Sequence, residues 1–304
     1  MGPTASGKTG LALALAEQLD LEIISVDSAQ VYRSMNIGSA KPSPEIRARV
    51  PHHLIDIHDP AEPYSAARFR EDALRLIQEI RARGRIPLLS GGTMLYFRAL
   101  QQGMSELPPA DAELRMRITA EAERSGWPAL HEKLTRLDPV SGARLHPNDS
   151  QRVSRALEII ELTGLTVGRA QQRAAVGGLS GRVIKLGLNP PERALLHQQI
   201  AKRFVQMMEQ GFLQEVTRLR ARGDLHLDLP SMRAVGYRQL WNHLDGRCDL
   251  AAAVEQGIAA TRQLAKRQFT WMRAETGLVR LDPSQPDLAA RALEHISTVA
   301  VKMP

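Results

Sequence analysis

Three features of the sequence predict an α/β fold in which a parallel sheet is flanked by helices. Short apolar strands alternate with amphipathic helices in the first third of the chain. A glycine-rich phosphate-loop pattern, G-x-x-x-x-G-K-[ST], spans residues 2–9 and runs directly into an Ala- and Leu-rich segment. The strand signal then vanishes in the middle of the chain. We therefore predict a catalytic phosphate-loop core over residues 1–106 and 179–304, with a helical C-terminal part, and an all-helical insertion domain over 107–178.

The loop pattern predicts a cradle for a diphosphate or a triphosphate. Gly2 and Gly7 let the backbone turn so that successive N–H groups point inward, and Lys8 adds a mobile ammonium. The Thr9 hydroxyl can hold Mg²⁺. The predicted diphosphate-binding residues are Gly2, Pro3, Thr4, Ala5, Ser6, Gly7, Lys8 and Thr9. A glycine-rich turn before an ordinary helix would match the same pattern, so a P-loop NTPase-like sheet is predicted only together with its context.

The sequence after the loop supports this context, whereas little sequence precedes it. Leu11, Leu15 and Leu19 recur every fourth residue among alanines, which favours a helix. The motif ordinarily follows a buried strand, but here only Met1 precedes Gly2. We therefore expect that the native chain begins earlier, with a short apolar strand.

Composition narrows the class of protein. The chain has 304 residues, of which 43% are hydrophobic, enough to bury a full core in one large domain or two. It has no apolar run of about 18 residues and no signal-peptide pattern, so we expect neither a membrane span nor secretion. The single cysteine, Cys248, excludes an internal disulfide and a cysteine-clustered zinc site and favours the cytoplasm. The net charge of +7 suits a polyanionic partner or simply a basic enzyme.

The first strand is predicted at residues 21–26, and Asp27 follows at its carboxyl end. This edge of an open α/β sheet faces the ligand, so Asp27 should face whatever the loop binds. From the residues alone, Asp27 could equally cap the following turn, and it could also be a Mg²⁺ ligand. A helix over 64–83 leads to a second strand at 86–90, where Gly91-Gly92-Thr93 forms another site of close backbone approach.

The connection between these elements is irregular and contains histidines. His52, His53 and His58 suggest a metal site. Adjacent histidines on an extended segment point to opposite faces, however, and no cysteine or i,i+4 partner joins them. We therefore expect no histidine-based metal site.

The insertion is charged as well as helical. Its helices are predicted at 114–124, 127–137 and 153–162. Gln151 and Arg155 share one helix face, with Arg152 adjacent. This face is either solvated or contacts phosphates and bases.

The chain returns to the sheet at 183–188, and 189–192 begins a helix with prolines in its first turn. Arg203 on this helix lies beside an apolar stripe, where an arginine is either a snorkelling surface residue or a ligand. A basic stripe with interleaved aromatic residues follows, formed by Arg262, Lys266, Arg267, Phe269, Trp271 and Arg273. The stripe suits a structured or single-stranded nucleic acid, although aromatics buried beneath a solvated face would give the same pattern.

Several motifs together resemble the bacterial tRNA dimethylallyltransferases, the tRNA isopentenyltransferase family, over essentially the whole chain. They are residues 2–9, Asp27-Ser28-Ala29-Gln30-Val31-Tyr32, Gly38-Ser39-Ala40-Lys41-Pro42, Gly91-Gly92-Thr93-Met94-Leu95-Tyr96, His146-Pro147-Asn148-Asp149, Gln151-Arg152, Val235-Gly236-Tyr237-Arg238 and Lys266-Arg267-Gln268. Enzymes of this family transfer the dimethylallyl group of dimethylallyl diphosphate to N6 of the adenosine 3′-adjacent to the anticodon. They act with Mg²⁺, on tRNAs that read codons starting with U. The resemblance implies that the phosphate loop holds a prenyl diphosphate.

The resemblance also implies roles for individual residues. Asp27 would be the general base, Lys8 and Thr9 would act on the diphosphate, Arg203 would bind the leaving pyrophosphate, and Thr9 would be the Mg²⁺ ligand. The tRNA anticodon stem-loop would be contacted by Asp27, Ser28, Ala29, Gln30, Thr93, Arg115, Gln151, Arg152, Val153, Ser154, Arg155, Arg233, Gly236, Tyr237, Arg238, Lys266, Arg267 and Arg273. We expect a cytoplasmic monomer with no membrane partner.

Three other functions compete with this one. A small-molecule kinase would use the same loop for ATP, but such kinases usually carry a Mg²⁺-binding Asp at the end of a second strand, where this chain has Ser90-Gly91-Gly92. An enzyme that prenylates free AMP or ADP would have little use for a basic tail and a helical insertion. A non-catalytic RNA-binding adaptor would explain the charge, but not why Lys8, Thr9 and Asp27 converge.

Overall fold

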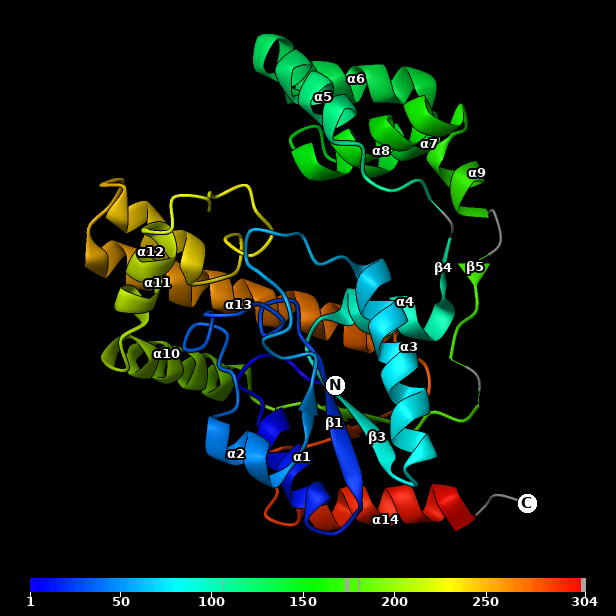
Figure 1. Cartoon of the computed structure of the whole chain (residues 1–304), viewed down its shortest axis with the longest axis vertical. Helices are drawn as coiled ribbons and strands as arrows, with labels where there is room; N and C mark the ends of the chain where they lie inside the picture. Colours follow the sequence, from blue (N-terminus) through cyan, green and yellow to red (C-terminus); the bar gives the residue numbers. More distant parts are fainter. Residues whose placement is uncertain (106, 173–174, 180, 302–304) are drawn as a thin grey trace. The chain divides into compact units, whose positions relative to one another are not determined.

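The computed structural model describes residues 1–105, 107–172, 175–179 and 181–301 (Figure 1). The chain divides into two compact units, one formed by Met1–Ala99 and Gly181–Pro304 and the other by Leu100–Ser180. The sequence boundaries at 107 and 178 both lie inside the second unit. Each unit is described by itself.

A parallel sheet lies at the centre of the first unit, as predicted. Strands β1 (Leu21–Val26), β2 (His52–His53) and β3 (Ile86–Gly91) are parallel, in the order β2-β1-β3. All six residues of β1 are buried, including the polar residues Glu22 and Ser25. Strands β6 (Lys185–Leu188) and β7 (Leu278–Leu281) form a second parallel pair. The backbone of Met1 pairs with β6: its amine donates to Leu186 O at 2.7 Å, and its carbonyl accepts from Leu188 N at 2.9 Å.

The sequence prediction was wrong about strands β2 and β7. It placed an irregular connection where β2 lies and only helices where β7 lies. Two residues of β2 pair with Ile23 and Ile24 of β1, and β7 is only four residues long. Such short segments carry too little periodicity to be recognised, and their pairing depends on partners that are distant in sequence.

Helices cover the sheet and form most of the remaining unit. They are α1 (Lys8–Ala16), α2 (Pro44–Arg49), α3 (Ala66–Ala82), α4 (Met94–Gln102), α10 (Arg193–Glu209), α11 (Phe212–Arg220), α12 (Tyr237–Leu244), α13 (Leu250–Ala274) and α14 (Leu288–Val301). Helix α3 packs on β1 and β3, and α1 contacts β1, β3 and α14 (Figure 1). One core cluster joins these layers through Leu15, Ile23, Leu188, Leu281 and Ala292. The helices predicted after the phosphate loop, over 64–83 and after Gly92 are confirmed.

The prediction for the start of α10 was wrong in one detail. Pro190 and Pro191 lie before Glu192, the N-cap residue of α10, and not in the first helical turn. They fix an extended approach to the helix, since the residue before a proline is biased away from helical backbone angles.

The second unit is built from short helices around its own core. Its elements are β4 (Met104–Ser105), α5 (Ala112–Ser125), α6 (Trp127–Leu137), α7 (Pro139–Arg144), α8 (Ser150–Thr163), α9 (Val167–Gln172) and β5 (Ala175–Val176). The three predicted helices are present, while α7, α9 and the antiparallel pair of β4 with β5 were not predicted. The core contains Leu114, Ile118, Leu130, Leu134 and Val153. None of the described helices in either unit is both long and apolar enough to cross a membrane.

Candidate active site

The phosphate loop has the conformation that its glycines and small residues permit. Ala5 and Gly7 have φ of 62° and 86°, in the left-handed region, and Gly7 is the N-cap residue of α1. Lys8 Nζ donates to the carbonyl of Pro3 at 2.7 Å, which folds the side chain back over the loop. The buried hydroxyl oxygen of Ser6 has no hydrogen-bond partner among the described residues. A loop of this shape, at a helix N-terminus, presents N–H donors and an ammonium to an anion.

The charge of Lys8 depends on its surroundings. Burial lowers the pKa of the Lys8 ammonium from its usual 10.5 to about 8, while the charge of Asp27 opposes this shift and that of Arg203 adds to it. Burial likewise lowers the pKa of Arg203, again with Asp27 opposing the shift. The three groups therefore lie close enough to influence one another across one pocket.

Gln268 of α13 links the phosphate loop to the turn after β3 by hydrogen bonds. Its Oε1 accepts from the backbone N–H of Thr4 at 2.8 Å, and its Nε2 donates to Gly92 O, also at 2.8 Å. A Cβ on Gly92 would lie 2.3 Å from this amide nitrogen, so a larger residue at this position would displace the Gln268 amide. Gln268 belongs to the motif Lys266-Arg267-Gln268, for which the resemblance implied contact with tRNA. Its spacing between the buried residues Ala265 and Met272 was the signal that could have placed it on the inner face of α13.

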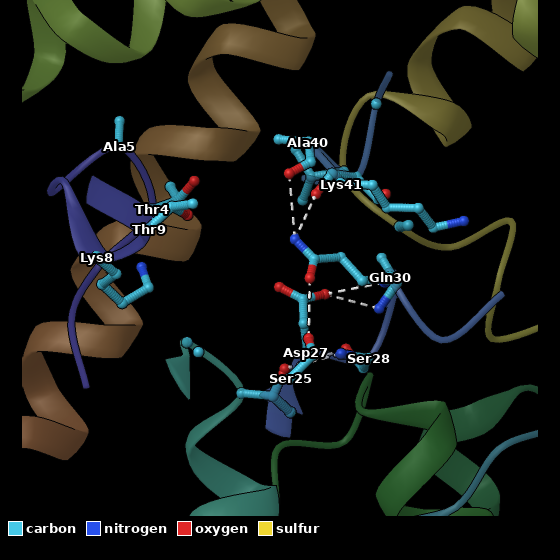
Figure 2. A pocket seen from close by; sticks show the side chains of 18 of the residues that line it. Thr4, Ala5, Lys8, Thr9, Ser25, Asp27, Ser28, Gln30, Ala40 and Lys41 are labelled. Atoms are coloured by element: carbon cyan, nitrogen blue, oxygen red, sulfur yellow. Dashed lines mark hydrogen bonds between the residues drawn. The ribbon is translucent and has the colours of Figure 1, made fainter. Parts of the chain in front are cut away.

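Asp27 lies directly after β1, at the edge that faces the phosphate loop. Its Oδ1 accepts from the N–H groups of Ala29 at 2.8 Å and Gln30 at 3.3 Å, which closes a tight turn. Figure 2 shows the other carboxylate oxygen turned towards the side of the pocket that carries Lys8. The capping role proposed from the sequence is therefore present, and it occupies only one oxygen.

Two further side chains hold the Asp27 turn in place. Thr93, in the turn after β3, accepts from Ser28 N at 3.0 Å through its hydroxyl oxygen. The amide of Gln30 accepts from Ser25 Oγ at 2.9 Å and donates to the carbonyls of Ser39 and Ala40 at 3.3 and 3.2 Å (Figure 2). The turn is thus fixed from the sheet on one side and from the 36–40 segment on the other.

One pocket brings these groups together. It has a volume of about 1230 Å³ and is lined by the loop residues Thr4 to Thr9, the Asp27–Gln30 turn, Thr93, Arg203, Arg233 and Arg267, among others, all from the first unit. Arg203 lines it with Ile200 and Phe204, so of the two alternatives left open by the sequence the structure favours a residue that faces the pocket. Typical small-molecule sites measure roughly 300–1,000 Å³. This pocket can therefore admit a diphosphate together with a second, larger group.

The predicted RNA-contact residues between 233 and 273 fall into three groups. Arg233 and Arg267 line the pocket, whereas Arg238, Lys266 and Arg273 are exposed outside it. Gly236 and Tyr237 are buried. The Tyr237 hydroxyl donates to Glu215 at 2.7 Å. The side chain of Tyr237 therefore belongs to the core, which corrects the expectation that it contacts RNA directly.

The aromatic residues of α13 also separate into two kinds. Phe269 packs against the cluster of Leu196, Ile200 and Ala265. Trp271 is 40% exposed and lines the pocket, with the Arg98 guanidinium 5.8 Å from its ring centroid. Phe269 therefore packs against the core, whereas Trp271 faces the pocket.

In the second unit, two of the predicted contact residues, Arg115 and Arg155, bind a buried carboxylate. Glu158 is fully buried and receives Nε and a terminal nitrogen of Arg115 at 2.9 and 3.0 Å, as well as Arg155 at 2.6 Å. Gln151 and Arg152 are exposed and Ser154 is half-buried. Val153 is buried in the core, so its side chain cannot contact RNA directly, which is a second correction.

The histidines of the connection are used in structural contacts. His53 Nε2 lies 2.6 Å from Glu22 Oε2, and His52 Nδ1 lies 2.6 Å from Val50 O. The residues that the structure describes contain no group of three or more His, Cys, Asp or Glu side chains that could hold a metal ion.

The fold and the site define a phosphate-loop protein with a parallel sheet, whose anion cradle and carboxylate face one pocket. Comparison with known proteins refines this class: the model of the family described as IPP transferase matches residues 30–275, and that of isopentenyl transferase matches residues 1–56. The chain belongs to the IPP transferase family, as the motif resemblance indicated.

Curated relatives and solved structures agree with this assignment. The chain is 56% identical over 301 residues to a tRNA dimethylallyltransferase of Bordetella petrii, covering 98% of this chain and 96% of the relative. It is 57% identical over 302 residues to one of Burkholderia cenocepacia, covering 98% and 93%. The tRNA isopentenylpyrophosphate transferase of Bacillus halodurans matches with a TM-score of 0.72 at 40% identity, covering 99% of this chain and 94% of that one. A eukaryotic dimethylallyltransferase acting on tRNA matches with a TM-score of 0.77 at 27% identity, covering 99% and 78%.

Proposed function

We propose that this enzyme transfers the dimethylallyl group of dimethylallyl diphosphate to N6 of the adenosine 3′-adjacent to the anticodon, in tRNAs that read codons starting with U. The observation that carries the proposal is the pocket in which the phosphate loop, Arg203 and the free oxygen of Asp27 converge. Close relatives named as tRNA dimethylallyltransferases support it over nearly the full chain.

The cations of the pocket would stabilise the leaving group. As the allylic C–O bond breaks, positive charge spreads over the prenyl group and negative charge grows on the pyrophosphate. Lys8, Arg203 and the N–H groups of the loop would bind that growing charge without having to reorganise. At neutral pH Lys8 is cationic even in the buried loop, because its pKa is about 8.

Mg²⁺ fits the oxygen donors of the loop. Thr9 is exposed at the pocket, and the Ser6 hydroxyl oxygen has no partner among the described residues. Mg²⁺ is commonly held by one or two protein oxygens and by substrate phosphates, which suits a site without an acidic cluster. Thr9 would hold the ion, which would neutralise part of the diphosphate charge.

Asp27 would act as the general base. Adenine N6 is barely basic, so its proton must be removed as the new N–C bond forms. The proton would pass to the carboxylate oxygen of Asp27 that is not used in the turn, while pyrophosphate leaves with the electrons of the broken C–O bond. Thr93 and Gln30 would keep the carboxylate in position through the turn.

The anticodon stem-loop of tRNA would be bound by cations from both units. Arg233 and Arg267 line the pocket. Arg238, Lys266 and Arg273, which are close to these two arginines in the sequence, are exposed, and so are Gln151 and Arg152 on α8. Arg115 and Arg155 remain half-exposed although they pair with Glu158. We further propose that the protein acts as a monomer in the cytoplasm, where this substrate occurs.

The test is to incubate the protein with dimethylallyl diphosphate or ATP, each with and without tRNA, and to weigh the products. The proposal predicts that tRNA gains one dimethylallyl group only with dimethylallyl diphosphate. Prenylated AMP or ADP would instead indicate an adenylate prenyltransferase, phosphoryl transfer from ATP a kinase, and binding of tRNA without any product a non-catalytic adaptor.

A further inference from the structure

A buried carboxylate on α11 gathers four hydrogen-bond donors from two distant parts of the chain. Glu215 is 3% exposed. Its Oε2 accepts from Asn36 N at 2.9 Å and Ile37 N at 2.8 Å. Its Oε1 accepts from Gly38 N at 3.2 Å and from the Tyr237 hydroxyl at 2.7 Å. An isolated buried carboxylate would be very unfavourable, so this set of donors is what makes the position tolerable.

The backbone held by Glu215 is a wall of the pocket. Residues 36–40 line it, and the carbonyls at the end of this segment, Ser39 and Ala40, bind the amide of Gln30. Gln30 in turn donates its backbone N–H to Oδ1 of Asp27. A continuous set of hydrogen bonds thus runs from Glu215 through the 36–40 segment to the Asp27 turn.

The same segment is also fixed by close packing. A Cβ on Gly38 would lie 2.1 Å from Phe212 Cε2 and 2.7 Å from Tyr237 Cε2, so the backbone rests directly on these two rings. The rings meet edge to face with centroids 4.9 Å apart. Polar and apolar contacts therefore hold the segment against the same support.

The charge of Glu215 suits its partners better than a neutral amide would. Burial, and then the charge of Glu215, raises the pKa of Tyr237 well above its usual value, so the hydroxyl stays protonated and donates. All four partners are donors, and a glutamine would have to turn an N–H₂ group towards at least one of them.

We propose that Glu215 is a positioning residue for prenyl transfer: it fixes the 36–40 segment, and through Gln30 it aligns the Asp27 turn against the incoming base. This role rests on the proposed function. It predicts that Glu215 matters for the tRNA side of the reaction and for turnover, and much less for the diphosphate, whose loop is braced separately by Gln268.

The test compares Glu215→Gln with a matched control, Glu22→Gln. Glu22 has a side chain that is 4% exposed and it is also held by several donors, but it lies at the start of β1 and does not line the pocket. For Glu215→Gln we expect kcat/KM for tRNA to fall about 10- to 100-fold, as for a reacting group misplaced by about 1 Å, with KM for dimethylallyl diphosphate within about threefold of the native value. Glu22→Gln, assayed well below its melting temperature, should have native values of kcat/KM for tRNA and of KM for dimethylallyl diphosphate.

A double-mutant cycle tests the route through Gln30. If Glu215 acts through Gln30, Glu215→Gln should cost far less in a Gln30→Ala background than in the native protein. If Glu215→Gln lowers kcat/KM for tRNA by the same factor in both backgrounds, the route through Gln30 is wrong.

Other outcomes are equally decisive. Native kinetics for Glu215→Gln, or a KM for dimethylallyl diphosphate that rises by as much as kcat/KM for tRNA falls, would overturn the positioning role while leaving the proposed function intact. A native protein that fails to prenylate tRNA would overturn the proposed function itself. If Glu215→Gln does not fold, Tyr237→Phe can replace it, because this variant removes only one of the four donors. A two- to tenfold fall in kcat/KM for tRNA, about the effect of one hydrogen bond, with an unchanged KM for dimethylallyl diphosphate would support the proposal. Native kinetics would contradict it.

Discussion

The two carboxylate oxygens of Asp27 have different surroundings. Oδ1 closes the turn after β1 by accepting from Ala29 N and Gln30 N. The other oxygen faces the side of the pocket with Lys8 (Figure 2). Turn geometry and proton transfer can therefore be separated by a substitution that keeps the first and removes the second.

Asp27→Asn is that substitution. The Asn oxygen can still accept from the turn, but the amide cannot take a proton, so kcat should fall about 10²–10⁴-fold while both substrates bind almost normally. Single-turnover prenylation and separate binding measurements would check this. Near-native turnover would reduce Asp27 to a cap, and rescue by excess Mg²⁺ would identify it as a metal ligand.

Lys8 is expected to act on the diphosphate and not on RNA. Lys8→Ala should raise KM for dimethylallyl diphosphate or lower kcat by about 10²–10³-fold, with tRNA affinity nearly unchanged. Because the pKa of Lys8 in the free loop is about 8, diphosphate binding to the native protein should weaken as the pH rises above 8, and this dependence should be lost in Lys8→Ala. A variant that lost tRNA binding but held the diphosphate normally would contradict the assignment.

At the scale of elements, β1 carries opposite kinds of carboxylate at its two ends. Asp27 follows its last residue and faces the pocket, whereas Glu22 near its start is buried among cations. Arg83 bonds to both oxygens of Glu22 at 2.9 and 2.8 Å, and His53 lies 2.6 Å from one of them. One end of the strand therefore faces the pocket, and the other carries a buried carboxylate held by ion pairs.

The Glu22 end makes stability depend on pH. Hydrogen bonds from Arg83, and then from His53, lower the pKa of Glu22 from 4.5 to about 2 despite its burial. Since the folded pKa is below the unfolded one, the stabilisation is complete above about pH 4.5 and is lost as the pH falls towards 2.

Glu22→Gln tests this dependence. At pH 7 the variant should lose about 1–3 kcal/mol, the usual cost when buried groups lose a charged hydrogen-bond partner. Its melting temperature should then decline less steeply than that of the native protein between pH 5 and pH 2, as thermal unfolding in a pH series would record. Parallel curves would show that Glu22 is not the group that titrates.

At the scale of the whole molecule, the pocket residues and the expected RNA contacts are divided differently between the two units. Every residue that lines the pocket belongs to the first unit, whereas exposed cations proposed to bind tRNA occur in both units. Arg267 is exposed and lines the pocket, and Arg152 is exposed on α8, where it pairs with Asp149 at 3.3 Å. Among the described residues, no hydrogen bond or ion pair gives these two arginines a common partner.

Their contributions to tRNA binding should therefore be independent. In a plot of log affinity against log salt concentration, Arg267→Gln and Arg152→Gln should each make the slope shallower by about one unit, and the double variant by about two. Arg291→Gln is the control, because Arg291 is exposed on α14, does not line the pocket and is not among the residues proposed to bind tRNA. An unchanged slope for either variant would assign that arginine to a solvated face.

Much of the site could be predicted from the sequence, because its parts are local in the chain. The phosphate loop and α1 are contiguous, Asp27 directly follows β1, and Thr93 lies two residues after the end of β3. Parallel strands place their carboxyl ends at one edge, so the sequence by itself determined that these groups would meet. Arg203 could be placed beside its apolar stripe by helical periodicity, which is also a local property.

Only the tertiary structure decided which polar side chains support the site. Gln268 bonds to Thr4 across 264 positions of the chain, and Glu215 bonds to Ile37 across 178. The motif resemblance implied that Tyr237 contacts RNA, whereas its side chain is buried against Glu215. The physical reason is that a buried polar group must find hydrogen-bond partners wherever the fold brings them, and neither periodicity nor propensity encodes a partner that far away.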